Sequence, residues 1–169
     1  MSRHEHGILV AVDESGASDR ALRYVANMVG ERSDVRIHLL HLLRPVPPAY
    51  REHGGSEDPD EERRLCEELR VQQENWIEKQ ATKEGPILAR ARSILVEAGV
   101  PETGIEISSS PSFGTIDVGP DCLTAARDGE CETIVVGRTS LPWFRELFRH
   151  HHCHDLVKRA RGFTVWVVE

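Results

Sequence analysis

Ile134-Val135-Val136-Gly137 is an apolar run that stops at a glycine, and a polar loop and a histidine-rich segment follow it. A buried parallel strand that ends this way before a helix is where α/β sheets bind anions, because helix N-termini leave backbone N–H groups free. Between Gly137 and Gly162 there are six Arg or Lys residues and two acids, although the formal net charge of the chain is −7. This local reversal of charge favours an anionic ligand.

Apolar runs of strand length recur along the chain and alternate with helical patterns. The predicted strands are residues 8–12, 35–43, 105–109, 133–136 and 163–168. The predicted helices lie between Ser15 or Ser18 and Gly30, at residues 60–84 and 87–98, within 115–127 and within 147–161. Strands that alternate with helices predict an α/β fold, with a doubly wound and mostly parallel sheet that is covered on both faces.

Two polar regions separate the second predicted strand from the third. Residues 44–60 contain four prolines and two adjacent glycines, which is typical of an exposed loop. The dipeptide Gly85-Pro86 predicts a break between two helices, because proline lacks the N–H group that a helix interior needs. The charged helix over residues 61–83 reads most simply as a solvated face, and its length suggests an arm for protein contacts.

Length and composition limit the classes of protein that fit. At 169 residues, the chain is one domain over residues 1–169. Its acidic balance argues against general nucleic-acid binding, which normally requires a basic excess. We expect no membrane span, because no window approaches the roughly 20 apolar residues that crossing a bilayer requires. The absence of an apolar signal core and of any C-x-x-C pair predicts a cytoplasmic protein with reduced thiols.

Four segments together resemble the universal stress protein family: the opening Ile8-Leu-Val-Ala-Val-Asp13-Glu-Ser, Leu39-Leu-His41-Leu, Ile134-Val-Val-Gly137 and the closing Phe163-Thr-Val-Trp-Val-Val. Their order and spacing match over nearly the whole chain. The resemblance implies an adenine nucleotide alpha hydrolase-like fold, with a five-stranded parallel sheet of order 3-2-1-4-5. It also implies a homodimer through the C-terminal strand, which as an apolar edge strand needs a partner or a cover.

Many members of that family bind ATP through Gly-x-x-Gly, nine residues, and then Gly followed by Ser or Thr. Gly137 matches the first position, whereas Ser140, His150 and His151 occupy the other three. The side chains of Ser140 and His150 would stand where backbone N–H groups should face phosphate. Any positive φ required there would cost a non-glycine residue roughly 1 kcal/mol or more. The chain therefore resembles the branch of the family that lacks the motif, and ATP binding is predicted to be weak or lost.

Other residues of the family's nucleotide site are retained. Asp13 matches the acidic residue that approaches the nucleoside, and Leu42 lies near the position that lines the adenine pocket. Arg138, Arg149 and partly protonated histidines could attract a phosphate. The resulting candidate set for a nucleotide is Asp13, Leu42, Gly137, Arg138, Thr139, Ser140, His150 and His151. For Asp13 an equally weighted reading is a turn-forming residue after a strand.

The run His150-His-His-Cys-His154 raises the alternative of a metal-binding module, since His150 and His154 fall one helical turn apart. Adjacent residues on a helix point in different directions, so a polar surface patch is the preferred interpretation and no metal is predicted. No motif of a hydrolase, a P-loop enzyme or a dinucleotide enzyme is present, so no catalytic residue is predicted. We expect a stress-response or regulatory protein that acts through dimerisation and contacts with a protein partner, and the alternative is an ATP or AMP sensor.

Overall fold

A five-stranded sheet forms the centre of the computed structural model, which describes residues 6–41, 47–50, 54–108, 118–138 and 161–169. All neighbouring strands are parallel and their order is β3-β2-β1-β4-β5. The strands are β1 (His6–Val12), β2 (Val35–His41), β3 (Ile105–Ser108), β4 (Cys131–Gly137) and β5 (Thr164–Val168). The predicted fold class and strand order are therefore confirmed.

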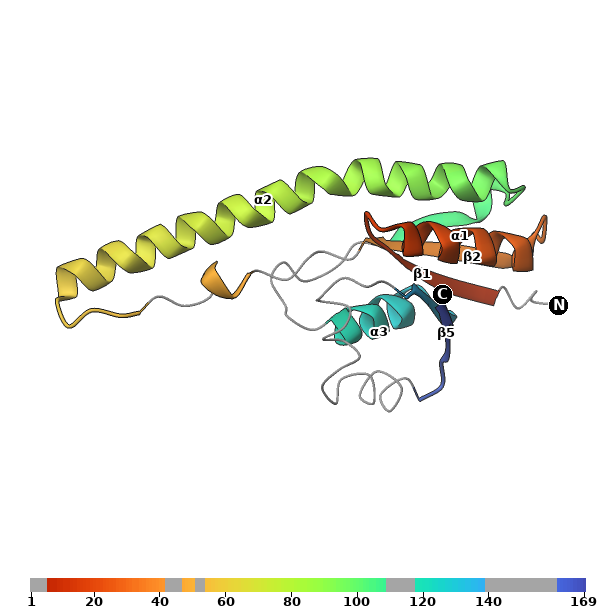
Figure 1. Cartoon of the computed structure of the whole chain (residues 1–169). Helices are drawn as coiled ribbons and strands as arrows, with labels where there is room; N and C mark the ends of the chain where they lie inside the picture. Colours follow the sequence, from red (N-terminus) through yellow and green to blue (C-terminus); the bar gives the residue numbers. More distant parts are fainter. Residues whose placement is uncertain (1–5, 42–46, 51–53, 109–117, 139–160) are drawn as a thin grey trace.

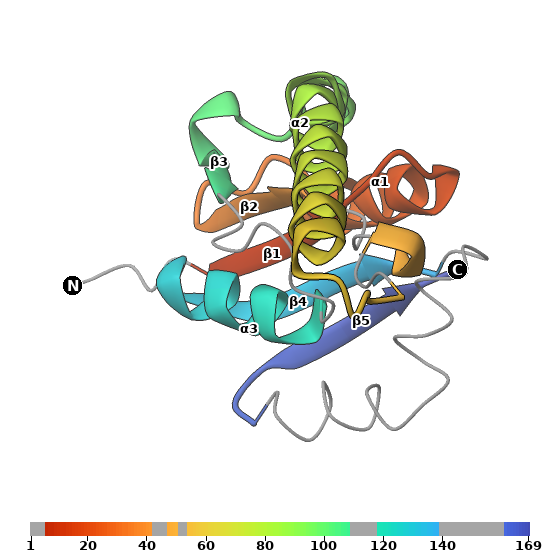
Figure 2. The ribbon, with the colours of Figure 1, turned by 90° about the vertical axis from the view of Figure 1, so that its left-hand side faces the viewer.

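Both faces of the sheet are buried, because helices cover each of them. Ile8 and Val10 belong to a core shared with α1 (Gly16–Val29) and α2 (Pro59–Glu97), whereas Leu9 belongs to a second core under α3 (Val118–Asp128). Figure 2 shows α3 on the opposite side of the sheet from α1 and α2. Successive side chains of a strand point to opposite faces, which explains why the central strands are apolar throughout. The predicted helix within residues 147–161 lies outside the described residues.

Helix α1 begins and ends where the sequence predicts. The hydroxyl of its N-cap, Ser15, accepts a hydrogen bond from the Ser18 N–H group at 3.3 Å. Gly30 ends the helix at a φ of +57°, and its N–H group donates to the Ala26 carbonyl at 2.8 Å. Glycine adopts this left-handed conformation without the steric cost that a side chain brings.

The predicted break at Gly85-Pro86 is wrong, because α2 runs without interruption from Pro59 to Glu97 with Pro86 inside it. Proline removes a single intrahelical hydrogen bond, the one that Thr82 would otherwise accept. The turns after Pro86 are held on the sheet by buried Leu88 and Leu95. Side-chain ion pairs support the turns before it, so both sides of the proline stay helical.

The N-terminal half of α2 extends beyond the sheet, and we call its residues 59–79 the arm. A helix of 39 residues measures about 58 Å at the usual rise per residue. Its buried residues are Gln80, Leu88, Ala91, Ile94 and Leu95, so none of them lies in the arm. Figure 1 shows the arm, in yellow, projecting away from the other elements. None of the helices in the described ranges has the length and apolar character needed to cross a membrane.

Candidate functional site

The carboxyl ends of β1, β2 and β4 meet at one edge of the sheet. Asp13 directly follows β1, His41 is the last residue of β2, and Gly137 is the last residue of β4. The chain leaves β1 for a helix on one face of the sheet, and β4 is reached from a helix on the other face. Ligands of doubly wound proteins bind in the crevice that this change of direction creates. This edge is therefore the first place to look for a site.

Asp13 organises the turn that leads into α1. Its Oδ1 atom accepts hydrogen bonds from the Ser15 N–H group at 2.8 Å and from the Ser15 hydroxyl at 2.5 Å. Its own N–H group donates to the hydroxyl of Ser18 at 3.2 Å. These contacts are those of a turn-forming aspartate, the reading that the sequence left open beside nucleoside contact. Among the hydrogen bonds between described residues, none is accepted by Oδ2.

Close packing explains why residue 137 is a glycine, Gly137. A Cβ atom at this position would lie 2.3 Å from the carbonyl oxygen of Ala17 and 3.0 Å from the Ser18 nitrogen. The first turn of α1 therefore passes directly over the end of β4, which leaves no room for a side chain. Its identity is explained by this contact without reference to a phosphate.

Arg138 is engaged with the end of the chain. Its N–H group donates to the carbonyl of Val168 at 2.6 Å, which continues the pairing of β4 with β5. Its guanidinium group forms an ion pair with the side chain of Glu169. Both side chains are exposed, so this pair can exchange with solvent or with another anion.

The remaining sequence candidates lie outside the described residues. These are Leu42, Thr139, Ser140, His150 and His151, together with the rest of the run from His150 to His154. The structure therefore brings Asp13 and Gly137 to one edge of the sheet, and whether the other candidate residues join them there stays a prediction. Among the residues that are described, no three His, Cys, Asp or Glu side chains are grouped in a way that could hold a metal ion.

A pocket of about 150 Å³ opens beside Asp13, between α1 and the middle of α2. Most of its surface is apolar, and its polar side chains come from the loop after β1, from α1 and from Arg90. The lining residues are Val12, Asp13, Glu14, Ser18, Asp19, Leu22, Pro86, Ile87, Arg90 and Ala91. Two ion pairs join α2 to the opposite side of the pocket. Arg90, which lines the pocket, pairs with Asp19, and Lys83, one turn before Pro86, pairs with Glu14 at 3.2 Å. The pocket therefore lies where the projecting half of α2 meets the body of the protein.

His41 is a residue of this edge that the sequence analysis did not single out. Its side chain is buried, and its Nδ1 atom has no hydrogen-bond partner within the described part of the chain. Burial lowers the pKa of His41, while the carboxylates of Glu84 and Asp13 act in the opposite direction. A histidine as the last residue of a strand, directly after the apolar pair Leu39-Leu40, was the signal that could have identified it.

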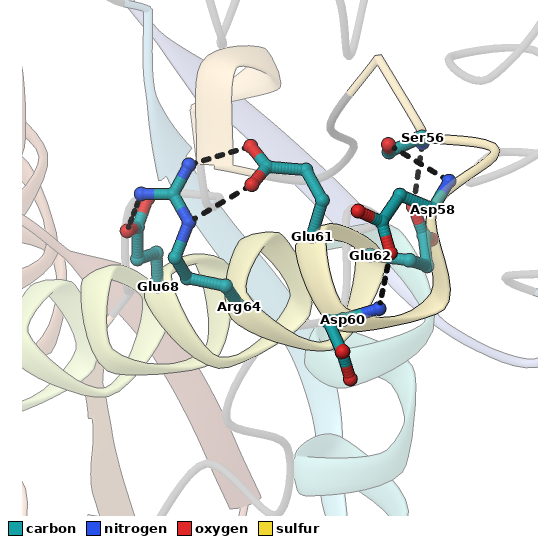
Figure 3. Close-up of polar contacts among 7 residues, drawn as sticks. All are labelled: Ser56, Asp58, Asp60, Glu61, Glu62, Arg64 and Glu68. Carbon is teal, nitrogen blue, oxygen red and sulfur yellow. Dashed lines mark hydrogen bonds and ion pairs between the residues drawn. The ribbon is translucent and has the colours of Figure 1, made fainter.

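The start of the arm is a second candidate element, because it is ordered by its own polar contacts (Figure 3). Asp58 caps α2 by accepting from the Asp60 N–H group at 3.0 Å, and Glu62 accepts from the Ser56 N–H group at 2.7 Å. Arg64 pairs with Glu61 at 2.6 Å and with Glu68 at 2.9 Å. Ion pairs at this spacing stabilise a helix that has little tertiary support.

The arm also contacts a short piece of the preceding loop. The rings of Tyr50 and Trp76 lie 6.2 Å apart between centroids. The Gln73 side-chain amide donates to the Tyr50 carbonyl at 2.6 Å. Tyr50 belongs to a single 3-10 turn, η1 (Pro48–Tyr50). The face of the arm that carries Trp76 is therefore turned toward this loop, while Val71 is exposed.

Comparison with known proteins places this geometry in context. The sequence profile of the universal stress protein family matches residues 6–169. No match was found among curated proteins. A universal stress protein family structure from Burkholderia pseudomallei is 18% identical, with a TM-score of 0.52 and coverage of 99% of this chain and 98% of that one.

Two further solved structures are similar at the level of the fold. One is a universal stress protein in complex with cAMP, 15% identical, with a TM-score of 0.56 and coverage of 97% of this chain and 96% of that one. The other is the protein MJ0577, 17% identical, with a TM-score of 0.56 and coverage of 98% and 96%. At such identities the likeness shows the fold alone.

Proposed function

The chain belongs to the universal stress protein family, and we propose that it is a stress-response or regulatory protein that acts through self-association and contacts with another protein. The arm of α2 is the observation that carries this proposal. No residue between Pro59 and Lys79 is buried, yet the helix is continuous and capped. A helical segment that contributes so little to the protein core is suited to presenting a surface to a partner.

Local interactions make the arm a stable helix without tertiary cover. Arg64 pairs with Glu61 and Glu68, and Arg70 pairs with Glu67 and Glu74. Exposed pairs of this kind contribute only about 0.3–0.5 kcal/mol each. Continuity with the docked turns after Pro86 supplies the nucleus that an isolated helix lacks. The arm is thus held in a defined direction, which favours recognition by a partner over a flexible tether.

Self-association through β5 is the second part of the proposal. In the described residues β5 pairs with β4 on one side only, which leaves the N–H and carbonyl groups of its other side open. Trp166 lies edge-on to Tyr24, with ring centroids 5.9 Å apart, and Val167 is exposed. An apolar edge strand of this kind needs a cover, and the same strand of a second copy supplies one.

Weak or absent ATP binding is the third part. The serine and the two histidines that replace family motif residues support it, namely Ser140, His150 and His151. The packing of Gly137 against Ala17 adds to that support, because it accounts for this glycine without a phosphate. We propose further that the protein is not an enzyme. We also propose a cytoplasmic location, with which the free thiols of Cys66, Cys122 and Cys131 agree.

An adenine-nucleotide sensor is the alternative, and two observations favour it. One solved neighbour is a universal stress protein in complex with cAMP. In this chain Asp13 lies at the carboxyl edge of the sheet beside a pocket, and within the described residues one of its carboxylate oxygens accepts no hydrogen bond. Such a sensor would use Asp13, Gly137, Arg138, Thr139 and Ser140.

Three measurements on the full-length protein test the proposal. Sedimentation at tens of micromolar should show a dimer, and calorimetry with ATP and with AMP should show no binding below the millimolar range. A photo-crosslinking residue at Val71 should capture a discrete partner in cells, whereas the same residue at exposed Arg23 on α1 should not. A monomer contradicts self-association through β5, and the lack of an adduct specific to Val71 contradicts recognition of a partner by the arm. Micromolar ATP binding that Asp13→Ala abolishes would establish the sensor instead.

A further inference from the structure

The pocket between α1 and α2 has a chemistry of its own, apart from the arm and the edge strand. We propose that it binds a small organic cation, a protonated amine attached to an apolar group about the size of one ring. Asp13 would receive the amine, and the apolar wall would receive the ring. This inference stands independently of the proposed function, because neither β5 nor the arm contributes to the pocket.

The size and the lining of the pocket set the apolar part of the ligand. Its volume is about 150 Å³, similar to that of an enclosed engineered cavity that binds benzene, but this pocket is partly open to solvent. Leu22 from α1 and Ala91 from α2 are almost fully buried and form apolar walls. Pro86 and Ile87, one turn before Ala91 on α2, add apolar surface. A single ring fills this space, whereas a larger ligand would extend into solvent.

The charges around the pocket set the polar part of the ligand. Three acids and one arginine line it, Asp13, Glu14, Asp19 and Arg90. Glu14 is paired with Lys83 from α2, and Asp19 is paired with Arg90. Within the described residues, Asp13 is thus the acid of the pocket that has no Lys or Arg partner. A bound ammonium group would supply that missing charge in a partly desolvated position.

Local hydrogen bonds fix the orientation of the Asp13 carboxylate. Two hydrogen bonds from Ser15 hold Oδ1, and the Asp13 N–H group is held by Ser18. The side chain therefore keeps its orientation before a ligand arrives, which reduces the entropy lost on binding. An anionic ligand would face the carboxylate of Asp13, whose charge no Lys or Arg of the described residues offsets, so we expect the pocket to favour an ammonium group over carboxylates and phosphates. This preference is opposite to that of the basic segment after Gly137.

Three probes that each carry a single benzene ring and one small polar group test the inference on the full-length protein. Benzylamine, benzyl alcohol and benzoate would be titrated by calorimetry and by chemical-shift changes in ¹⁵N-labelled protein. Benzylamine should bind, benzyl alcohol should bind more weakly, and benzoate should bind roughly ten-fold or more weakly than benzylamine. The largest shifts should fall on the amide groups of Asp13, Leu22 and Ala91.

Matched variants separate the pocket from general effects. Asp13→Asn keeps an oxygen that can cap Ser15 but removes the charge, so it should weaken benzylamine roughly ten-fold and leave benzyl alcohol unchanged. Asp58→Asn makes the same change at the cap of α2 and should have no effect. Ile87→Phe should fill the pocket and abolish binding of both probes, whereas Val96→Phe, on an exposed position of the same helix, should not.

Specific outcomes would overturn the inference. Equal binding of benzoate and benzylamine would remove the role of Asp13, as would unchanged benzylamine affinity in Asp13→Asn. Competition by AMP at a lower concentration than benzylamine would assign the pocket to a nucleotide. Failure of sedimentation to show a dimer would affect only the proposed function, so the two sets of results are distinguishable.

Discussion

Gly137 and Ala17 lie so close together that a Cβ atom on the glycine would stand 2.3 Å from the alanine carbonyl oxygen. This contact joins the end of a central strand to the first turn of α1. It fixes the position of the turn that carries Asp13 relative to β4. A glycine that the sequence associates with phosphate is thus required by the packing of a helix on the sheet.

The first prediction concerns this contact. Gly137→Ala should lower the free energy of unfolding by about 2–3 kcal/mol, because the atom that it meets is backbone and cannot rotate away. Urea unfolding followed by circular dichroism measures the loss. Gly85→Ala is the control, since its Cβ would meet nothing within 4 Å and α2 is helical there. That variant should be stabilised by roughly 0.5–1 kcal/mol.

The second prediction concerns pH. Burial lowers the pKa of His38 and of His41 in the folded protein. The unfolded chain therefore takes up protons first as the pH falls below about 6.5, and the free energy of unfolding should decrease as acid is added. The slope of stability between about pH 6.5 and 5 should be smaller in His41→Gln than in the natural protein. Equal slopes would show that His41 is not desolvated on folding.

The third prediction concerns thiol reactivity. Burial raises the pKa of the Cys131 thiol to about 12, and its Sγ atom lies 3.6 Å from the Gly129 carbonyl. Cys66 is exposed on the arm. Iodoacetamide at about pH 8 should therefore modify Cys66 rapidly and leave Cys131 unmodified until the protein unfolds, since the thiolate is the reactive form. Peptide mass spectrometry over time would distinguish the two sites, and rapid labelling of Cys131 in folded protein would contradict the structure.

The fourth prediction concerns the proline inside α2. Pro86→Ala would restore the N–H group that can donate to the Thr82 carbonyl, in a helix that is already continuous. Thermal unfolding should show an increase in stability of roughly 1–2 kcal/mol, less than the full helix penalty of proline because the unfolded chain also gains freedom. Pro59→Ala is the control, because proline is well tolerated at the first helical position. A less stable Pro86→Ala protein would mean that the ring contributes packing that the structure does not indicate.

Much of the architecture can be predicted from local sequence. The all-apolar run at Ile134–Val136 predicts a strand buried on both faces, and Ser15 and Gly30 predict the ends of α1, because strand burial and helix capping depend on residues close in sequence. The prediction of a break at Gly85-Pro86 was wrong for a physical reason. Proline indicates only the local loss of one helical hydrogen bond, whereas the continuity of α2 depends on the packing of Leu88 and Leu95 against the sheet.

The residues of the candidate site were likewise only partly predictable from the sequence. By itself the sequence determined the alternation of strands and helices, the mostly parallel sheet and the presence of Asp13 directly after the first strand, since these follow from the order of residue types along the chain. The order of the strands was implied by the resemblance to the universal stress protein family. Only the tertiary structure decided that Gly137 packs against Ala17, that His41 is buried near Asp13, and that α1 and α2 enclose a pocket between them. Each of these depends on distances between segments far apart in the chain, which local preferences do not encode.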